Sequence, residues 1–189
     1  NISQIFCIWQ GGLSIYGALL GFLATSIVFL RKYGYNLWLW FDLMMPSILF
    51  GLIILQLANF MMQFSLGTPL GLDIPNDHSL AEYVEYRYRP TGFEAYQYFQ
   101  PVALYQAFAY SIVFMISVLC LLINRKYKFL AEGTVFLFSV ILMAIIRFGI
   151  GFMYFSVNKD MLLYPMQWIA LTVMIATVFI YVVKRFQHN

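Results

Sequence analysis

Long apolar runs alternate with short polar segments along the 189-residue chain. A helix needs about 20 residues to cross the hydrocarbon core of a membrane, and five runs are long enough to do so. They cover residues 11–30, 37–64, 102–124, 132–155 and 162–183. The second run is longer than a span requires and contains Pro46, so we expect a tilted or kinked helix there. The pattern predicts an all-α, polytopic transmembrane helix bundle that forms a single membrane domain, 1–189.

The segment between the second and third runs, residues 65–101, breaks this pattern. It is polar and rich in aromatic residues, contains four prolines, and shows no strong periodicity. Loops of this length often act as lids or binding arms. We therefore interpret residues 65–101 as a functional loop outside the bundle, and call it the arm.

Composition and charge agree with a membrane protein, since 62% of the residues are hydrophobic and 10% are charged, against about 25% charged residues in soluble domains. One set of connections contains Arg31, Lys32, Arg125, Lys126, Lys128, Lys184 and Arg185. The opposite set contains Arg87, Arg89 and Lys159, together with most of the acidic residues. Because cytoplasmic loops are enriched in Lys and Arg, we predict a cytoplasmic C-terminus and an extracytoplasmic arm. The net charge of +3 follows from this bias and needs no nucleic-acid partner to explain it.

Cysteine and histidine usage does not indicate a metal site. Cys7 and Cys120 lie in different segments without a CxxC spacing, and His78 and His188 lie in the arm and near the C-terminus. We therefore expect neither a metal ion nor another cofactor. The chain begins at Asn1 rather than at Met, so we expect further sequence before it.

Amide side chains recur at helical spacing near the outer end of the second run. Gln56, Asn59, Gln63 and Gly67 are three, four and four residues apart, which places them on one helix face. A buried amide costs free energy unless it finds a partner. Two interpretations stay open: the amides hydrogen-bond between helices, which is the commoner use, or they line a polar cavity.

Other polar groups fall at the same predicted depth. They are Tyr16 in the first run, Gln100, Tyr105 and Gln106 near the start of the third, Arg147 in the fourth and Gln167 in the fifth. Arg147 is the only Lys or Arg deep inside a run, where it needs an anion, a wet cavity or backbone carbonyls as partners. Asp42 and Glu132 fall toward the cytoplasmic side, and we interpret Asp42 as a capping or interfacial residue. We therefore expect Arg147 to meet an external anion, of which a lipid phosphate is the most available.

Five segments resemble, in order, motifs of the bacterial prolipoprotein diacylglyceryl transferases. Residues 8–21, IWQGGLSIYGALLG, resemble the family segment IWxGGLAI(H/Y)GGLIG. Residues 55–67, LQLANFMMQFSLG, lie on its signature G-R-x-(G/A)-N-F-x-N-x-E-x-x-G. Residues 100–106 resemble its HP…LYE motif, 146–148 its GRF motif, and 166–167 the start of its last helix. The stretch before the signature is matched by Asp42, Pro46, Ser47 and Gly51.

The resemblance implies a reaction and a location. The diacylglyceryl group of phosphatidylglycerol would pass to the lipobox cysteine of a prolipoprotein, which forms a thioether and releases glycerol-1-phosphate. The protein would lie in the bacterial plasma membrane, with its active cleft facing the extracytoplasmic leaflet and the family's first two helices missing from this chain. The catalytic residues would be Tyr16, Asn59 and Arg147, with Arg147 on the phosphate. The residues that bind lipid or substrate would be Gln56, Gln63, Gly67, Gln100, Tyr105, Gln106 and Gln167.

The chain departs from the family pattern mainly at charged positions. Asn59, Phe60 and Gly67 match the signature, and Ala58 is an allowed variant. The replacements are Leu55 for Gly, Gln56 for Arg, Met62 for Asn, Phe64 for Glu, Gln100 for His, Gln106 for Glu, and Gly151 where the family usually has Glu. A glutamine brings neither the charge nor the bidentate fork of an arginine. The hypotheses are therefore an active but divergent transferase, a catalytically impaired member that binds phospholipid or lipoprotein precursors, and an unrelated small-solute transporter.

Overall fold

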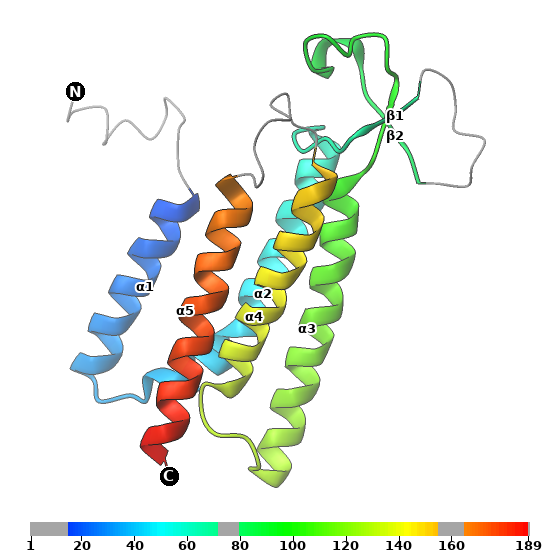
Figure 1. Ribbon diagram of the computed structural model, residues 1–189. Helices are drawn as coiled ribbons and strands as arrows, with labels where there is room; N and C mark the ends of the chain where they lie inside the picture. Colours follow the sequence, from blue (N-terminus) through cyan, green and yellow to red (C-terminus); the bar gives the residue numbers. More distant parts are fainter. Residues whose placement is uncertain (1–14, 72–79, 155–164, 189) are drawn as a thin grey trace, which may run out of the picture.

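The computed structural model describes residues 15–71, 80–154 and 165–188. Its long helices are α1 (Ile15–Lys32), α2 (Leu37–Met61), α3 (Val102–Tyr127), α4 (Thr134–Ile150) and α5 (Pro165–His188). The helices run up and down, and the arm lies at the end of the bundle where α2 and α4 end and α3 and α5 begin (Figure 1). We call this the arm end. The prediction of an all-α helix bundle is confirmed.

Four helical segments in the described part of the chain are long and apolar enough to cross a membrane. They are Leu37–Met61, Val102–Tyr127, Thr134–Met153 and Met166–Lys184. The third of them joins α4 to the short 3-10 helix η4 (Gly151–Met153). The protein is therefore a multi-pass membrane protein. The first expected span, residues 11–30, corresponds to α1, which is not among the four, and residues 11–14 lie outside the described part.

Helix α2 continues through Pro46 and ends earlier than its apolar run predicts. The side chain of Asn36 caps its first turn by accepting a hydrogen bond from the Trp38 N–H, and its last helical residue is Met61. Gln63 then adopts a φ of +52°, which is uncommon for a residue other than glycine. The predicted helical face therefore covers Gln56 and Asn59 but not Gln63 or Gly67, and that part of the prediction is wrong.

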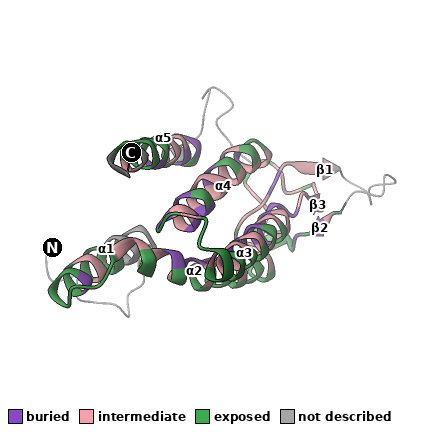
Figure 2. Cartoon of the chain, turned by 90° about the horizontal axis from the view of Figure 1, so that it is seen from below, coloured by how far each residue is buried: buried purple, intermediate pink, exposed green. Residues whose placement is uncertain are grey.

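The bundle core lies between α2, α3 and α4. Helix α2 packs on α3, α3 on α4, and α4 on α5, and the exposed residues lie mainly on the outer faces of the helices (Figure 2). Met45, Leu49 and Val113 form the buried cluster. The Ser117 and Ser139 hydroxyls are buried and 2.7 Å apart, so they join α3 to α4 by a hydrogen bond. Such short polar contacts hold helices together where both helix faces are apolar.

The arm contains a small antiparallel sheet that the sequence pattern did not predict. Its strands are β1 (Pro69–Gly71), β2 (Glu82–Tyr83) and β3 (Tyr98–Phe99), in the order β1-β3-β2. Strands of two or three residues are too short to give a readable alternation of apolar and polar positions. The guanidinium of Arg89 holds the connection between β2 and β3, because it donates to the carbonyls of Val84 at 2.9 Å and Glu94 at 2.8 Å.

At the opposite end of the bundle, Asp42 ties α2 to the start of α4. Its two carboxylate oxygens accept hydrogen bonds from the backbone N–H groups of Gly133 at 2.6 Å and Phe136 at 2.7 Å. A carboxylate is favourable here because the first N–H groups of a helix lack partners and carry partial positive charge. The ammonium of Lys184 on α5 lies 4.3 Å above the Trp38 ring beside them. The interpretation of Asp42 as a capping residue is confirmed, with the cap on a different helix from its own.

Candidate functional site

Gly67 brings the ends of α2, α3 and α4 together at the arm end. Its N–H donates to the Gln100 carbonyl at 3.1 Å, and it forms an isolated β-bridge with Tyr154. A Cβ atom at this position would lie 2.5 Å from Val102 Cγ2 and 2.6 Å from the Gln100 carbonyl oxygen. Glycine is therefore needed for close packing of the protein itself, and the predicted role of Gly67 in binding lipid stays a prediction.

Tyr154 is the centre of a polar cluster beneath this bridge. Its hydroxyl donates to Gln106 Oε1 at 3.1 Å. Burial raises the pKa of Tyr154, while the charge of Arg147 and hydrogen bonds with Ser65 and Gln106 act in the opposite direction. The phenol therefore stays protonated near neutral pH and acts as a hydrogen-bond donor. Tyr154 was not predicted as a site residue, because a tyrosine at the end of an apolar run is typical of the interfacial aromatic belt.

Gln106 is fully buried in this cluster. Its Oε1 atom is occupied by Tyr154, but no acceptor among the described residues lies within hydrogen-bond distance of its Nε2 atom. A buried donor without a partner costs about 1–3 kcal/mol. The cluster therefore presents an amide donor that a ligand oxygen could satisfy.

Arg147 lies in the last turn of α4, at the arm end, where the sequence placed it. Its side chain is half-buried, and Nη2 approaches Met166 Sδ on α5 at 3.8 Å. A cation is favourable near a helix C-terminus, which supplies a structural reason for an arginine here. Its positive charge acts on the Tyr154 phenol and opposes the rise in the pKa of that group, so the charge acts at the arm end of the bundle.

Gln167 packs against the end of α4 from the α5 side. The residue is 1% exposed, and its Nε2 atom donates to the Phe148 carbonyl at 3.4 Å. A Cβ atom at Gly151 would lie 2.7 Å from Gln167 Cγ. The Gln167 side chain therefore occupies the space next to Gly151.

Gln56 and Asn59 pair with each other on α2. Asn59 Nδ2 donates to Gln56 Oε1 at 3.2 Å, and Gln56 is buried. This hydrogen bond lies within one helix, so it does not join α2 to a neighbouring helix. The pair presents neutral amides where the family signature has an arginine and an asparagine.

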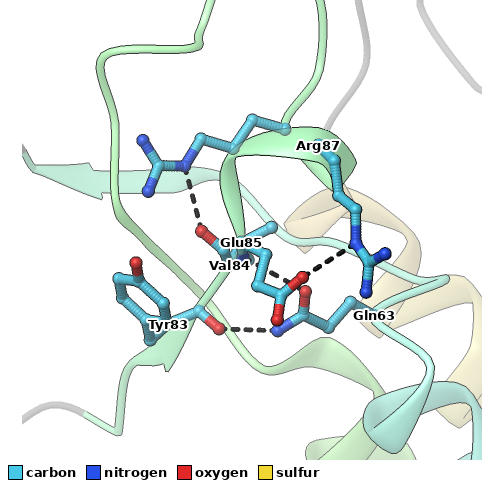
Figure 3. A network of polar contacts seen from close by, with 6 residues as sticks. Gln63, Tyr83, Val84, Glu85 and Arg87 are labelled. Carbon is cyan, nitrogen blue, oxygen red and sulfur yellow. Dashed lines mark hydrogen bonds and ion pairs between the residues drawn. The ribbon is translucent and has the colours of Figure 1, made fainter.

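The remaining predicted residues do not join the cluster through any hydrogen bond in the described part of the chain. Gln63 binds the arm through its side-chain amide (Figure 3). Gln100 uses its backbone to pair with Gly67, and Tyr105 is half-buried in the first turn of α3. Tyr16 is in the first turn of α1, and its side chain lies outside the described part.

Glu82 on β2 is a second residue that the sequence analysis missed. It is 5% exposed, and neither carboxylate oxygen has a hydrogen-bond partner among the described residues. Burial raises its pKa from 4.5 to about 7. No local pattern signals this burial, because a strand of two residues shows no alternation of apolar and polar positions.

The Tyr154 cluster combines one guanidinium with neutral donors and acceptors. Arg147 supplies positive charge, and Tyr154 and Gln106 supply a phenol and an amide that are partly shielded from solvent. Such a set suits an oxyanion, because charge and hydrogen bonds act together where water is scarce. In the described part of the chain, no three His, Cys, Asp or Glu side chains come close enough to hold a metal ion.

Comparison with known proteins identifies the family. A family model described as prolipoprotein diacylglyceryl transferase matches residues 1–183. The phosphatidylglycerol–prolipoprotein diacylglyceryl transferase of Lactobacillus acidophilus is 28% identical over 184 residues, which are 97% of this chain and 63% of that protein. The protein of the same name from Geobacillus kaustophilus is 30% identical over 186 residues, or 98% of this chain and 66% of that protein. The chain thus spans just under two thirds of the length of these relatives. It belongs to the prolipoprotein diacylglyceryl transferase family.

Proposed function

We propose that this protein transfers the diacylglyceryl group of phosphatidylglycerol to the cysteine thiol of a prolipoprotein. The family match and the names of the relatives support this activity. The bacterial relatives support a location in the bacterial plasma membrane. The Lys and Arg distribution supports an arm end, and hence an active cleft, on the extracytoplasmic side. The observation that carries the proposal is the Tyr154 cluster at the arm end, in which the half-buried phenol feels the charge of Arg147 and donates to the buried Gln106 amide.

The reaction needs positive charge on the phosphate of the lipid. The cysteine sulfur forms a bond to the glycerol carbon of the diacylglyceryl group, and the bond from that carbon to the phosphate oxygen breaks. Glycerol phosphate leaves with the electron pair of that bond, and the thiol proton ends on the released phosphate. Arg147 pairs with the phosphate and stabilises the negative charge that grows on the leaving oxygen. The Gln106 Nε2 donor, which has no partner among the described residues, fits a second oxygen of the headgroup.

The amides around this cluster shape the headgroup site in the proposal. Gln56 and Asn59 form its wall on α2, where Gln56 takes the place of a family arginine. Gln167 forms the α5 side, and Gln100 lies at the entry to α3. Further substrate contacts are assigned to Gln63, Gly67, Tyr105 and Tyr16.

A second function is favoured by the neutral character of the site. Gln56 binds Asn59 instead of presenting a guanidinium, and Gln167 fills the space beside Gly151. A neutral hydrogen-bonded pair thus stands where the resemblance implies an arginine, and Gly151 carries no carboxylate where it implies a glutamate. A family member of this kind would bind phospholipid or lipoprotein precursors with little or no transfer.

Product formation and lipid binding together separate the two functions. The purified protein is placed in nanodiscs that contain phosphatidylglycerol, and a lipobox peptide with one cysteine is added. A thioether-linked diacylglyceryl peptide supports transfer, whereas persistent lipid binding without product supports the binding function. Arg147→Ala is expected to weaken binding of anionic lipid in either case, with binding of zwitterionic lipid as the control. Unchanged binding of phosphatidylglycerol would contradict the assignment of Arg147 to the headgroup.

A further inference from the structure

The side-chain amide of Gln63 occupies an edge of the arm sheet. Its Nε2 atom donates to the Tyr83 carbonyl at 2.7 Å, and its Oε1 atom accepts from the Glu85 N–H at 3.2 Å (Figure 3). The amide thereby satisfies the C=O of one residue and the N–H of the residue two positions further on. A strand that paired with β2 in the parallel direction would make the same two bonds through the N–H and C=O of one of its residues.

The main-chain geometry of β2 directs these groups away from the sheet. The Val84 N–H donates to the Gln97 carbonyl on the β3 side at 3.0 Å. Because successive residues of an extended chain point their backbone groups to opposite sides, Tyr83 and Glu85 turn theirs outward. We call these outward groups the β2 edge. Strand β2 is at the end of the order β1-β3-β2, and an edge strand is a template for another extended chain.

The surroundings of the β2 edge are apolar and exposed. Met62 and Phe64, on either side of Gln63, are 68% and 80% exposed, and Tyr83 and Tyr86 are also exposed. The Arg87 guanidinium pairs with the Glu85 carboxylate at 2.8 Å. The Arg89 guanidinium lies over the Tyr83 and Tyr86 rings and donates to backbone carbonyls, so these charged groups are already engaged within the arm. The chemistry therefore fits an extended segment with apolar side chains rather than a charged ligand.

We propose that the β2 edge is the docking site for an extended segment of the prolipoprotein substrate, whose main chain replaces the Gln63 amide. The identity of this occupant rests on the function proposed above. Main-chain pairing gives affinity without requiring a particular side-chain sequence, which suits recognition of precursors that share little beyond a cysteine. Gln63, which occupies the edge, follows shortly after α2, whose Gln56 and Asn59 form the wall of the proposed headgroup site, so a bound strand lies at the arm end with the lipid.

A proline substitution tests the β2 edge without straining the backbone. Glu85 has a φ of −60°, which is the value that proline imposes. Glu85→Pro removes the N–H that the docked strand needs, and Glu85→Ala is the matched control that keeps it. Binding of a fluorescent lipobox peptide to the full chain in phosphatidylglycerol nanodiscs is measured by anisotropy. Both variants are compared in a Gln63→Ala background, which removes the amide that occupies this N–H in the free protein. There, loss of one backbone hydrogen bond is expected to weaken binding about three- to tenfold in Glu85→Pro relative to Glu85→Ala. Equal binding by the two variants would overturn the proposal.

An N-methyl scan of the peptide tests the same proposal on the unaltered protein. Methylating the backbone nitrogens one at a time should weaken binding at alternate residues, because only every second residue of a docked strand turns toward β2. A scan without alternation rejects strand docking. If the unmodified peptide still becomes lipidated while the scan is flat, the docking proposal fails and the proposed function stands. If the scan alternates but no product forms, docking stands and the proposed catalysis fails.

Discussion

Substitution of Glu82 by Gln should remove a pH dependence from the stability of the arm. The carboxyl group is 5% exposed, has no hydrogen-bond partner among the described residues, and has a pKa raised from 4.5 to about 7 by burial. Between pH 4.5 and about 7, the Glu82 carboxyl group therefore keeps its proton in the folded arm and releases it in the unfolded arm. Its contribution to stability is fully present below pH 4.5 and is lost as the pH rises through about 7.

The size of this change in the free energy of unfolding follows from the rise in the Glu82 pKa. At 1.36 kcal/mol for each pKa unit, the rise from 4.5 to about 7 corresponds to about 3 kcal/mol between the low-pH and high-pH limits. Glu82→Gln places a permanently neutral group of the same size at this position. The variant should match the wild type near pH 5 and be more stable than the wild type near pH 8.

Thermal unfolding from pH 5 to 8.5 in one detergent, followed by intrinsic fluorescence and by arm proteolysis, measures the effect. Glu85→Gln is the matched control, because Glu85 is an exposed glutamate of the same arm. The melting temperature of the wild type and of Glu85→Gln should fall with pH relative to that of Glu82→Gln. If the melting temperatures of Glu82→Gln and wild type changed with pH in parallel, burial would not raise the pKa of Glu82 in the folded arm.

Three further substitutions test the packing that supports the site, each by thermal unfolding in detergent. Gly67→Ala should cost about 3 kcal/mol, because its Cβ meets the Gln100 carbonyl at 2.6 Å; an unchanged melting temperature would contradict this contact. Asp42→Ala should cost about 3 kcal/mol by leaving two N–H groups of α4 without acceptors, and Asp42→Asn should cost less; equal melting temperatures of all three proteins would exclude the cap. Gly151→Ala should cost about 2 kcal/mol, and adding Gln167→Ala should recover part of it; purely additive losses would rule out their contact.

The bundle could be predicted because long hydrophobic runs report directly on membrane spans. Asp42 could also be interpreted in advance, since an acid near the end of a span next to aromatic residues has few other uses. The structure adds that its partner N–H groups belong to Gly133 and Phe136, 91 and 94 residues away. No local pattern encodes a contact between such distant segments.

The site could be predicted only in part. Arg147 and Gln106 were recognised because charged and amide side chains are rare in apolar runs, and in the structure Gln106 accepts a hydrogen bond from Tyr154 while the charge of Arg147 acts on the same phenol. Gln63 was expected on the face of Gln56, but its positive φ turns the chain after Met61 and sends its amide to the arm. Backbone turns of this kind depend on tertiary contacts, so spacing alone does not reveal them.

The central claim is that this protein joins the diacylglyceryl group of phosphatidylglycerol to a cysteine. The most direct measurement is mass spectrometry of a lipobox peptide after incubation with the protein in vesicles of phosphatidylglycerol whose diacylglyceryl part carries deuterium. Transfer to cysteine predicts a labelled thioether on the cysteine peptide and none on the same peptide with serine in place of cysteine. A cysteine peptide that stays unmodified, although the protein binds the labelled lipid, would contradict it.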